Sequence, residues 1–310
     1  MNLLLSISFN GIFNSLTGGV AQGLTWGLLA IAVYISFRIL NTADMTVDGS
    51  LALGGVLTAV LISCGWHFIL AMIVAVISSA LAGAITGILH TKLKIPAILA
   101  GILTMSALYS VNMALMSGKS SIAILEFNTL KTMWGNFPIT YVEMITSTVL
   151  VIIVISALYW FFGTEIGSSI RATGDNEQMS RAQGINTDNT KILGLTISNA
   201  LAGLAGSIIT QINGSADVNM ATGTIVIGLA SVVIGEIVFG HKLEFWGKLL
   251  SVVVGSIIYR IIIVIAYLLN MPTMYTKLLS AIIIALALGL PILKSKLSKS
   301  KENKQGERKC

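Results

Sequence analysis

Repeated apolar stretches, each roughly 20 residues long, restrict this chain more than any other feature of its sequence. A helix of roughly 20 apolar residues crosses the hydrocarbon core of a bilayer and satisfies its own backbone hydrogen bonds there. The pattern therefore predicts an all-α, polytopic membrane protein with about 8–10 transmembrane helices. The expected spans are residues 20–40, 49–66, 68–90, 96–117, 141–162, 192–213, 222–239, 246–269 and 276–293.

Composition favours one membrane domain without a separate soluble domain. Charged residues make up 10% of the 310 residues, whereas soluble domains carry about 25%. We therefore expect a transmembrane domain over residues 1–293, with a hydrophilic loop at 163–191, and a basic tail at 294–310. The net charge of +6 comes from residues next to the ends of spans, so it predicts topology and no nucleic-acid partner.

The distribution of basic residues predicts the orientation in the membrane. Alternation through the spans places the loops at 90–94, 163–191 and 241–248 on the same side as the tail at 294–310, and these segments are rich in Lys, Arg and His. Basic residues concentrate in cytoplasmic loops. The loop at 163–191 and the C-terminus are therefore expected in the cytoplasm, with the lipid bilayer around the spans.

The loop at 163–191 is the long hydrophilic interruption of an otherwise apolar chain, and it contains the signals of a short helix. Asp175 or Asn176 can cap the start of that helix, and Gln178 stands three residues after Asp175, as in a capping box. Gly184 supplies a position where the chain can turn left-handed after the helix. The sequence predicts a single rigid helix of about two turns.

Two carboxylates, Asp44 and Asp48, precede the short, glycine-rich stretch 49–66, which is a candidate for a broken or re-entrant helix. Charged groups at membrane depth usually face a cavity or a partner. At the membrane surface, the same residues would mark a helix start, where negative charge is favourable. Both interpretations stay open from the sequence.

Residues 42–46 resemble residues 215–219, because each stretch follows a span, has a central aspartate and precedes glycine and an apolar run. An odd number of spans separates the copies, so they would point in opposite directions, as in the inverted repeats of transporters. The translocation path is then expected near the interface of the repeats. Its candidate residues are Asp44, Asp48, Asn213, Asp217, Asn219 and Arg260.

Glu236 and Arg260 are the deepest charges in the second half of the chain. At 1.5 Å per residue, Glu236 lies about 6 Å from the cytoplasmic end of its helix and Arg260 about 21 Å, so no salt bridge between them is expected. Glu236 is expected to meet backbone or a cytoplasmic-side partner. Arg260 is expected to face the interior of the bundle, where it satisfies carbonyl groups or attracts an anionic group such as a substrate carboxylate.

Glycines recur at a four-residue spacing on two of the expected spans. Gly19, Gly23 and Gly27 lie at the first span, and Gly83 and Gly87 lie on the third. Small residues at this spacing allow another helix to approach closely. We therefore expect both faces to be contacts between helices.

The sequence predicts no enzymatic chemistry. The nucleotide-binding pattern G-x-x-x-x-G-K-[ST] is absent, since the stretch that ends at 118–120 has Met113 in place of the first glycine. The histidines are far apart, and Cys64 and Cys310 are expected on opposite faces of the membrane. No catalytic residue, metal site, cofactor or disulfide is expected, and any ATP hydrolysis belongs to a separate subunit.

Several motifs resemble the permease subunits of bacterial ABC importers, in the large family of branched-chain amino-acid, ribose and nucleoside permeases. Residues 171–176 and 181–185 are similar to the RA-x-G-x-N…GI segment of that family. Residues 199–206 match its S-x-x-LAG-x-AG helix. The stretch 44–50, DMTVDGS, is closer to a subgroup with DLTVDGS at this place, which is associated with tryptophan or tyrosine transport.

The resemblance implies a type II-like ABC importer permease that takes up a small, amino-acid-like solute across a bacterial cell membrane. It implies three kinds of partner: a second permease copy, a cytoplasmic dimer of ATPase subunits and an extracytoplasmic substrate-binding lipoprotein. The helix in the hydrophilic loop would be a coupling helix that docks on the ATPase. The residues implied in this contact are Arg171, Ala172, Gly174, Asp175, Asn176, Arg181, Gly184 and Ile185. Substitution of Gly174 or Arg171 is expected to abolish coupling while the fold stays intact.

Other functions remain open from the sequence. The chain resembles sugar and nucleoside permeases of the same family as well as amino-acid permeases. An ion-coupled carrier that works alone, with Asp44, Asp48 or Glu236 as the ion site, is a different class, and a purely structural membrane protein is another. The capped hydrophilic helix favours a permease driven by a separate ATPase, because a carrier that works alone has no motor to contact.

Overall fold

The computed structural model describes residues 9–125, 127–130, 132, 138–240, 243–285 and 289. The tail at 294–310, as well as His241 and Lys242, lies outside these residues. The described elements are α1 Phe9–Tyr34, a π-helical turn Ile35–Ile39, α2 Thr46–Ser63, α3 Phe68–Thr91, α4 Ala97–Leu115, β1 Ser121–Ala123, α5 Ile139–Gly163, α6 Glu165–Asp175, α7 Glu177–Ala182, α8 Thr187–Asn213, β2 Ser215–Asp217, α9 Thr224–Phe239, α10 Phe245–Leu268 and a 3-10 turn Thr273–Tyr275.

Seven helices in the described part of the chain are long and apolar enough to cross a membrane: α1 with its π-helical turn, α2, α3, α4, α5, α8 and α10. They confirm the predicted polytopic, all-α class. The expected span at 222–239 differs, since the shorter apolar helix α9 lies there. Of the expected span at 276–293, the apolar helix Thr276–Ala285 is described, whereas residues 286–288 and 290–293 lie outside the described residues. Gly223 and Gly240, both with positive φ, bound α9. Its 16 residues reach about 24 Å, less than the ~30 Å hydrocarbon core.

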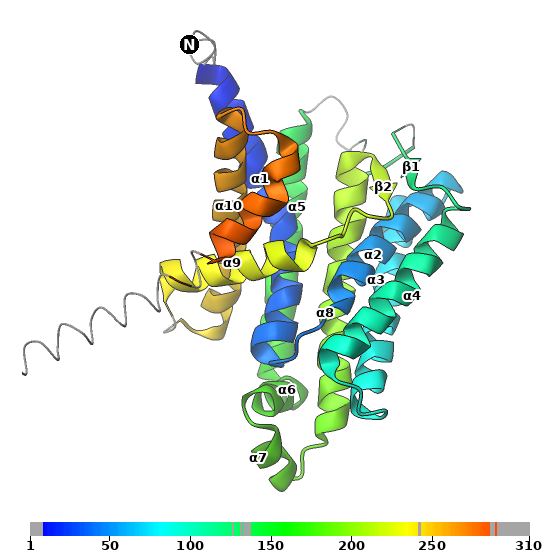
Figure 1. Cartoon of the computed structure of the whole chain (residues 1–310), viewed down its shortest axis with the longest axis vertical. Helices are drawn as coiled ribbons and strands as arrows, with labels where there is room; N and C mark the ends of the chain where they lie inside the picture. Colours follow the sequence, from blue (N-terminus) through cyan, green and yellow to red (C-terminus); the bar gives the residue numbers. More distant parts are fainter. Residues whose placement is uncertain are drawn as a thin grey trace, which may run out of the picture.

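The long helices run side by side between two ends of the molecule (Figure 1). In this view α1, α3 and α5 descend, whereas α2, α4, α8 and α10 ascend. α6 and α7 lie at the lower end, β1 and β2 lie at the upper end, and α9 lies across the bundle at mid-height. The α3–α4 loop and the α6–α7 segment thus share one end, as their basic residues predicted.

α1 is the central helix of the bundle. Residues 27–36 are buried on every side of it, and α5, α8, α9 and α10 all pack against it. A helix that is apolar all round belongs in the interior of a larger bundle. The side chains of this stretch form the main hydrophobic core together with residues of the surrounding helices.

The glycine faces are contacts between helices, as their spacing predicted. A Cβ atom on Gly23 of α1 would lie 2.6 Å from Ile257 Cα in α10. A Cβ atom on Gly83 of α3 would lie 2.7 Å from Asn199 Cβ in α8. Both glycines therefore allow a backbone approach that any larger residue would prevent.

The helix motif at 199–206 has the same role on the neighbouring face of α8. A Cβ atom on Gly206 would collide with the carbonyl oxygen of Leu51, and one on Gly203 would collide with Ser79. α2 and α3 both approach α8 closely at these glycines. The motif thus fixes how the first half of the chain packs on the second half.

The two stretches of similar sequence form the same turn in the structure. Asp44 Oδ1 accepts a hydrogen bond from the Thr46 N–H (2.8 Å), and Asp217 Oδ1 accepts one from the Asn219 N–H (2.7 Å). The helix before the first turn, α1, descends, and the helix before the second, α8, ascends (Figure 1). Local structure and direction are both those that an inverted repeat requires.

We predict that Gly23→Ala destabilises the protein in detergent, by about 1–3 kcal/mol, because the added methyl group overpacks the contact with Ile257. Gly18→Ala is the matched control on the same helix, since no atom lies within 4 Å of its Cβ position. Thermal unfolding midpoints of the two variants provide the measurement. Equal midpoints would contradict the close contact between α1 and α10.

Candidate functional site

The hydrophilic loop contains two helices, α6 and α7, where the sequence predicted a single one. α6 begins directly after α5, because Thr164 Oγ1 accepts a hydrogen bond from the Gly167 N–H (3.3 Å) and caps the helix. Ile170 of α6 is fully buried. The side chain of Ile170 therefore anchors α6 to the bundle. The sequence did not predict this helix, because the segment is polar overall.

α7 is the predicted short helix, and Asn176 is its cap. The Asn176 Oδ1 atom accepts a hydrogen bond from the Met179 N–H (3.0 Å). Asp175, the alternative cap, is the last residue of α6. The capping box between Asp175 and Gln178 does not form, because the cap stands one residue later than that pairing requires.

Gly184 ends α7 in the way its position predicted. It has φ of +84°, and its N–H donates to the Arg181 carbonyl (3.0 Å) while the Ile185 N–H donates to the Ser180 carbonyl (3.0 Å). This pair of hydrogen bonds is a Schellman motif, which satisfies the last carbonyl groups of the helix. α7 is therefore closed at both ends.

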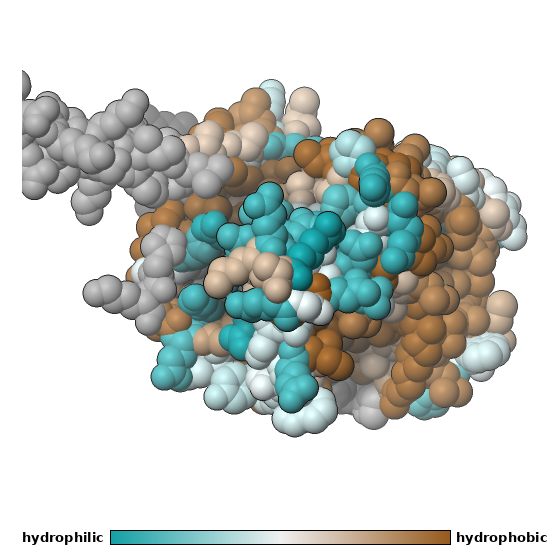
Figure 2. Space-filling view, turned by 90° about the horizontal axis from the view of Figure 1, so that it is seen from below, coloured by the Kyte–Doolittle hydropathy of each residue, from teal (hydrophilic) through white to brown (hydrophobic). Residues whose placement is uncertain are grey.

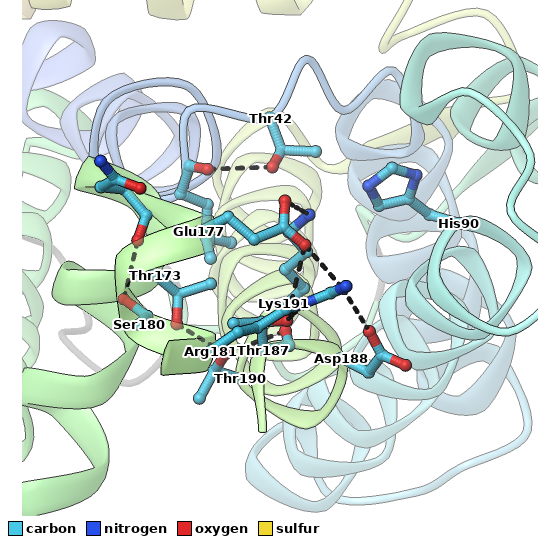
Figure 3. A network of polar contacts seen from close by, with 12 residues as sticks. Thr42, His90, Thr173, Glu177, Ser180, Arg181, Thr187, Asp188, Thr190 and Lys191 are labelled. Carbon is cyan, nitrogen blue, oxygen red and sulfur yellow. Dashed lines mark hydrogen bonds and ion pairs between the residues drawn. The ribbon is translucent and has the colours of Figure 1, made fainter. Parts of the chain in front are cut away.

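Ion pairs fix α7 to the beginning of α8 (Figure 3). Glu177 accepts hydrogen bonds from Arg181 Nη2 (2.9 Å) and Lys191 Nζ (2.6 Å). Arg181 also donates to Thr187 Oγ1 (2.6 Å) and Asp188 Oδ1 (3.2 Å). A single exposed ion pair contributes little, but a network with shared partners restrains both helices. α7 and the first turn of α8 therefore form one rigid unit.

Arg171 and Gly174 face the bundle. Arg171 Nη2 donates to the Phe162 carbonyl (2.9 Å), and its guanidinium lies 5.5 Å from the centre of the Phe245 ring. A Cβ atom on Gly174 would collide with the carbonyl oxygen of Ile39. The expectation that a substitution at Gly174 leaves the fold intact is therefore wrong, because only glycine fits against this backbone.

The outward surface of the segment is formed by other residues. Asp175, Asn176, Arg181 and Gly184 are exposed, and Ala172 and Ile185 are partly buried. Hydrophilic atoms gather over this end of the molecule, with apolar flanks behind them (Figure 2).

Met179 is an apolar residue on this hydrophilic surface, and its side chain is 60% exposed. Met179 was not among the residues expected at this surface. Its signal was available, because a methionine in the middle of a short polar helix has no core to fill. We call Asp175, Gln178, Met179, Ala182 and Gln183 the α7 tip.

Asp44 is buried and fully engaged. Its Oδ1 atom caps the start of α2 at Thr46, and its Oδ2 atom accepts a hydrogen bond from Asn199 Nδ2 (2.7 Å). Asn199 Oδ1 in turn accepts one from Ser50 Oγ (2.7 Å). Of the two readings that the sequence left open, Asp44 combines both: it marks a helix start, and it does so inside the bundle with a partner on α8.

Asp48 caps a different helix from its own. Its Oδ1 atom accepts hydrogen bonds from Thr224 Oγ1 (2.6 Å) and the Ile225 N–H (2.8 Å), and its Oδ2 atom accepts one from the Gly223 N–H (3.0 Å). These groups are the free donors at the start of α9. The side chain is 6% exposed, so the first turn of α2 and the start of α9 meet at a buried carboxylate.

Glu236 holds the other end of α9. It forms a two-pronged ion pair with Arg38 of the π-helical turn, with Arg38 Nε donating to Oε1 (2.7 Å). The prediction that Glu236 does not pair with Arg260 is confirmed. Its actual partner was missed, since Arg38 lies 198 positions away in the sequence.

Arg260 lies on α10 against α1, where its guanidinium carbon is 4.6 Å from the centre of the Trp26 ring. Its Nε atom is buried and has no hydrogen-bond partner among the described residues. The residue as a whole is partly buried, with its guanidinium against α1, and the expected carbonyl partner for Nε is absent among the described residues.

The other candidate path residues lie at the upper end of α8, away from Asp44. Asn213 and Asn219 are exposed, and Asp217 is partly buried in β2, which pairs with β1. Among the described residues, no hydrogen bond or ion pair joins these side chains to Arg260 or Asp48, although Val218, between Asp217 and Asn219, lines the same small pocket as Asp48. Among the described residues, no group of His, Cys, Asp and Glu side chains has the arrangement of a metal site.

Comparison with known proteins identifies the family. Residues 15–288 match the model of the permease component of branched-chain amino acid transport systems. The chain belongs to this family. It is therefore the permease component of an ABC-type transport system for an amino acid or a sugar, and a multi-pass membrane protein. Permeases of this kind work in general with a separate ATPase and a binding protein, and they are not themselves catalysts.

Individual relatives cover most of the chain. The tyrosine transport system permease protein of Clostridioides difficile is 38% identical over 94% of this chain and 95% of its own length. The ribose import permease protein RbsC of Haemophilus influenzae is 26% identical over 93% of this chain and 83% of its own length. The autoinducer 2 import system permease protein LsrC of Yersinia pseudotuberculosis is 27% identical over 83% of this chain and 71% of its own length. No solved structure matches.

We predict that Asp48→Asn destabilises the protein by about 1–3 kcal/mol, because an amide cannot accept all the hydrogen bonds from the start of α9. Asp217→Asn is the control: its turn needs one acceptor, which an amide supplies, so the change is expected within about 0.5 kcal/mol. Thermal unfolding in detergent compares the two. An equal loss of stability in both variants would contradict the role of Asp48 as the acceptor for the start of α9.

We predict a pH dependence for the anchoring of α7. The hydrogen bond from Lys191, followed by the charges of Lys191 and Arg181, lowers the pKa of Glu177 below its ordinary value of 4.5. A lowered pKa means that this stabilisation is present above pH 4.5 and is lost as the pH falls through the folded-state pKa. Hydrogen exchange of the α7 amides, corrected for intrinsic rates, is therefore expected to accelerate only in that acidic range.

Glu177→Gln is the matched variant for this measurement, since it keeps the shape of the side chain and removes its charge. Its α7 amides are expected to exchange fast throughout the pH range, while those of α6, which Thr164 caps without a titrating group, stay unchanged. Protection of α7 that is the same in both proteins would contradict the role given to Glu177.

Proposed function

We propose that this chain is the membrane-spanning subunit of an ATP-driven importer in a bacterial cell membrane, with its C-terminus in the cytoplasm. Two copies form the translocation path for a small, amino-acid-like solute. An extracytoplasmic binding lipoprotein delivers the solute, and a separate dimer of ATPase subunits docks on the α6–α7 segment.

The observation that carries this proposal is the construction of the α6–α7 segment. A part that receives movement from another subunit must be exposed and must not deform under load. α7 is capped at Asn176, closed at Gly184 and ion-paired to α8, and the α7 tip is exposed. Among the residues expected to couple, Asp175, Asn176, Arg181 and Gly184 are available to a partner, whereas Arg171 and Gly174 hold the segment on the bundle.

The position of this segment supports a cytoplasmic location. Lys92 of the α3–α4 loop forms an ion pair with Asp188 at the start of α8 (3.6 Å). The basic residues of both loops are therefore gathered at one end of the molecule, which the positive-inside rule assigns to the cytoplasm.

The alternative of an ion-coupled carrier is not favoured by the acidic residues. Asp44 and Asp48 are each occupied by hydrogen bonds from helix starts, and Glu236 is paired with Arg38. An ion site needs carboxylate oxygens that can change partners during transport, and these are engaged in holding helices.

An amino-acid-like solute is favoured over a sugar by the relatives. The tyrosine transport permease has 38% identity over 291 residues, whereas the ribose permeases have 26% to 28%. A sugar or nucleoside remains the second candidate class.

We predict that Met179→Asp abolishes ATP-driven uptake and binding of the ATPase, because it replaces the exposed apolar side chain of the α7 tip by a charge. Met274→Asp is the matched control, since Met274 is 76% exposed in the turn after α10, at the opposite end of the molecule. The measurement is co-purification with the ATPase subunit of the same transport system, together with uptake into proteoliposomes that contain the binding protein.

Two outcomes would overturn the proposal. One is normal ATPase binding and uptake by the Met179→Asp protein. The other is uptake by the wild-type protein without ATP and in response to a proton gradient, which would identify an ion-coupled carrier.

A further inference from the structure

Arg260 is a partly buried cation in the middle part of α10, and its buried Nε has no acceptor among the described residues. It stands 15 positions after the start of α10 at Phe245 and eight before its end at Leu268, so it lies about 22 Å and 12 Å from the two ends. Its guanidinium lies over the Trp26 ring. A ring face attracts a cation but accepts no hydrogen bond in the plane of the guanidinium.

Burial of a cation inside a membrane protein costs free energy. The chain offsets this cost for its buried acidic side chains but not for Arg260. The acidic side chains that hold helices in place, Asp44, Asp48 and Glu236, all have hydrogen-bonded partners. An intramembrane charge without such a partner marks a site for function. The N–H groups of Arg260 form a fork that matches a carboxylate.

A buried acid lies on α5, the helix that packs against both α1 and α10. Glu143 of α5 is 8% exposed, and its Oε1 atom accepts a hydrogen bond from Thr25 Oγ1 (3.3 Å). No salt bridge joins Glu143 and Arg260 among the described residues. Thr25 and Trp26 are consecutive on α1, so the acid and the cation flank one turn of that helix.

We propose that Arg260 and Glu143 bind the charged head of an α-amino acid. The carboxylate of the ligand receives the guanidinium N–H groups of Arg260, and its ammonium group donates to Glu143. This inference rests on the proposed transport function and specifies the solute: a zwitterion, which a sugar cannot imitate.

The charges make this pairing favourable. A buried ion is tolerated when its partner and its hydrogen bonds are supplied together. A zwitterion supplies both partners at once and adds no net charge to the membrane interior. An anionic lipid would satisfy Arg260 alone and would leave Glu143 facing a negative phosphate.

The test uses the complete complex of permease and ATPase in nanodiscs of phosphatidylcholine, without the binding protein. Binding of the standard L-amino acids is measured, and the tightest one is compared with its amine analogue, which lacks the carboxylate, and its acid analogue, which lacks the ammonium. The wild-type complex is expected to bind the amino acid at least about tenfold more tightly than either analogue, since each loses one charged pair.

The variants are expected to give mirror-image results. Arg260→Gln lowers affinity for the amino acid to that for the amine analogue and leaves the amine analogue unaffected. Glu143→Gln does the same with the acid analogue. Arg260→Lys keeps the charge without the fork and is expected to lie between wild type and Arg260→Gln. Lys119→Gln, at an exposed cation between α4 and β1, leaves all affinities unchanged.

The controls separate this inference from the proposed function. ATP-driven uptake by the wild-type protein and loss of uptake in Met179→Asp test the importer, whether or not Arg260 touches the solute. Absence of binding of every amino acid would overturn the site, as would unchanged discrimination in Arg260→Gln and Glu143→Gln. Displacement of the amino acid by phosphatidylglycerol in wild type but not in Arg260→Gln would assign Arg260 to a lipid and would also overturn it. If Arg260→Gln does not fold, the Glu143→Gln profile decides.

Discussion

The carboxylate of Asp48 is the contact on which the middle of this bundle depends. A helix that starts inside a membrane protein exposes N–H groups that no water can satisfy. Asp48 stands in the first turn of α2 and accepts hydrogen bonds from the free donors of α9. One side chain therefore joins the starts of two helices. At its far end, α9 is held by the ion pair of Glu236 with Arg38. α9, which is too short to span the bilayer, is thus held in its transverse position by polar contacts at both ends.

Small residues make this arrangement possible around α8. Gly203 and Gly206 let α3 and α2 approach the backbone of α8, and Asn199 joins α8 to Asp44 by a hydrogen bond. Apolar packing alone provides little direction inside a bilayer, since lipid tails are as apolar as side chains. Close backbone contact and a few buried polar pairs therefore determine which helix lies beside which.

The sequence predicted most of the spans, the glycine contacts, the turn at Gly184 and the short helix α7, because each depends on local periodicity or on a residue type with one strong preference. It did not predict that α9 lies across the bundle, since hydropathy reports how apolar a helix is and not its direction. Asn176 and Asp175 are both good caps, so the choice between them came from the length of α6. Arg38 and Glu143 were missed because their partners, Glu236 and Thr25, are distant in sequence.

The ion pairs between α7 and α8 have a consequence for the opposite face of the membrane. α8 has 27 residues, so it is a rod about 40 Å long, and β2 follows directly at its upper end and pairs with β1. Any tilt imposed on α7 is passed to this rod rather than absorbed in a flexible joint. A displacement of the α6–α7 segment is therefore expected at the ribbon of β1 and β2 as well, so that α8 links the two ends of the molecule.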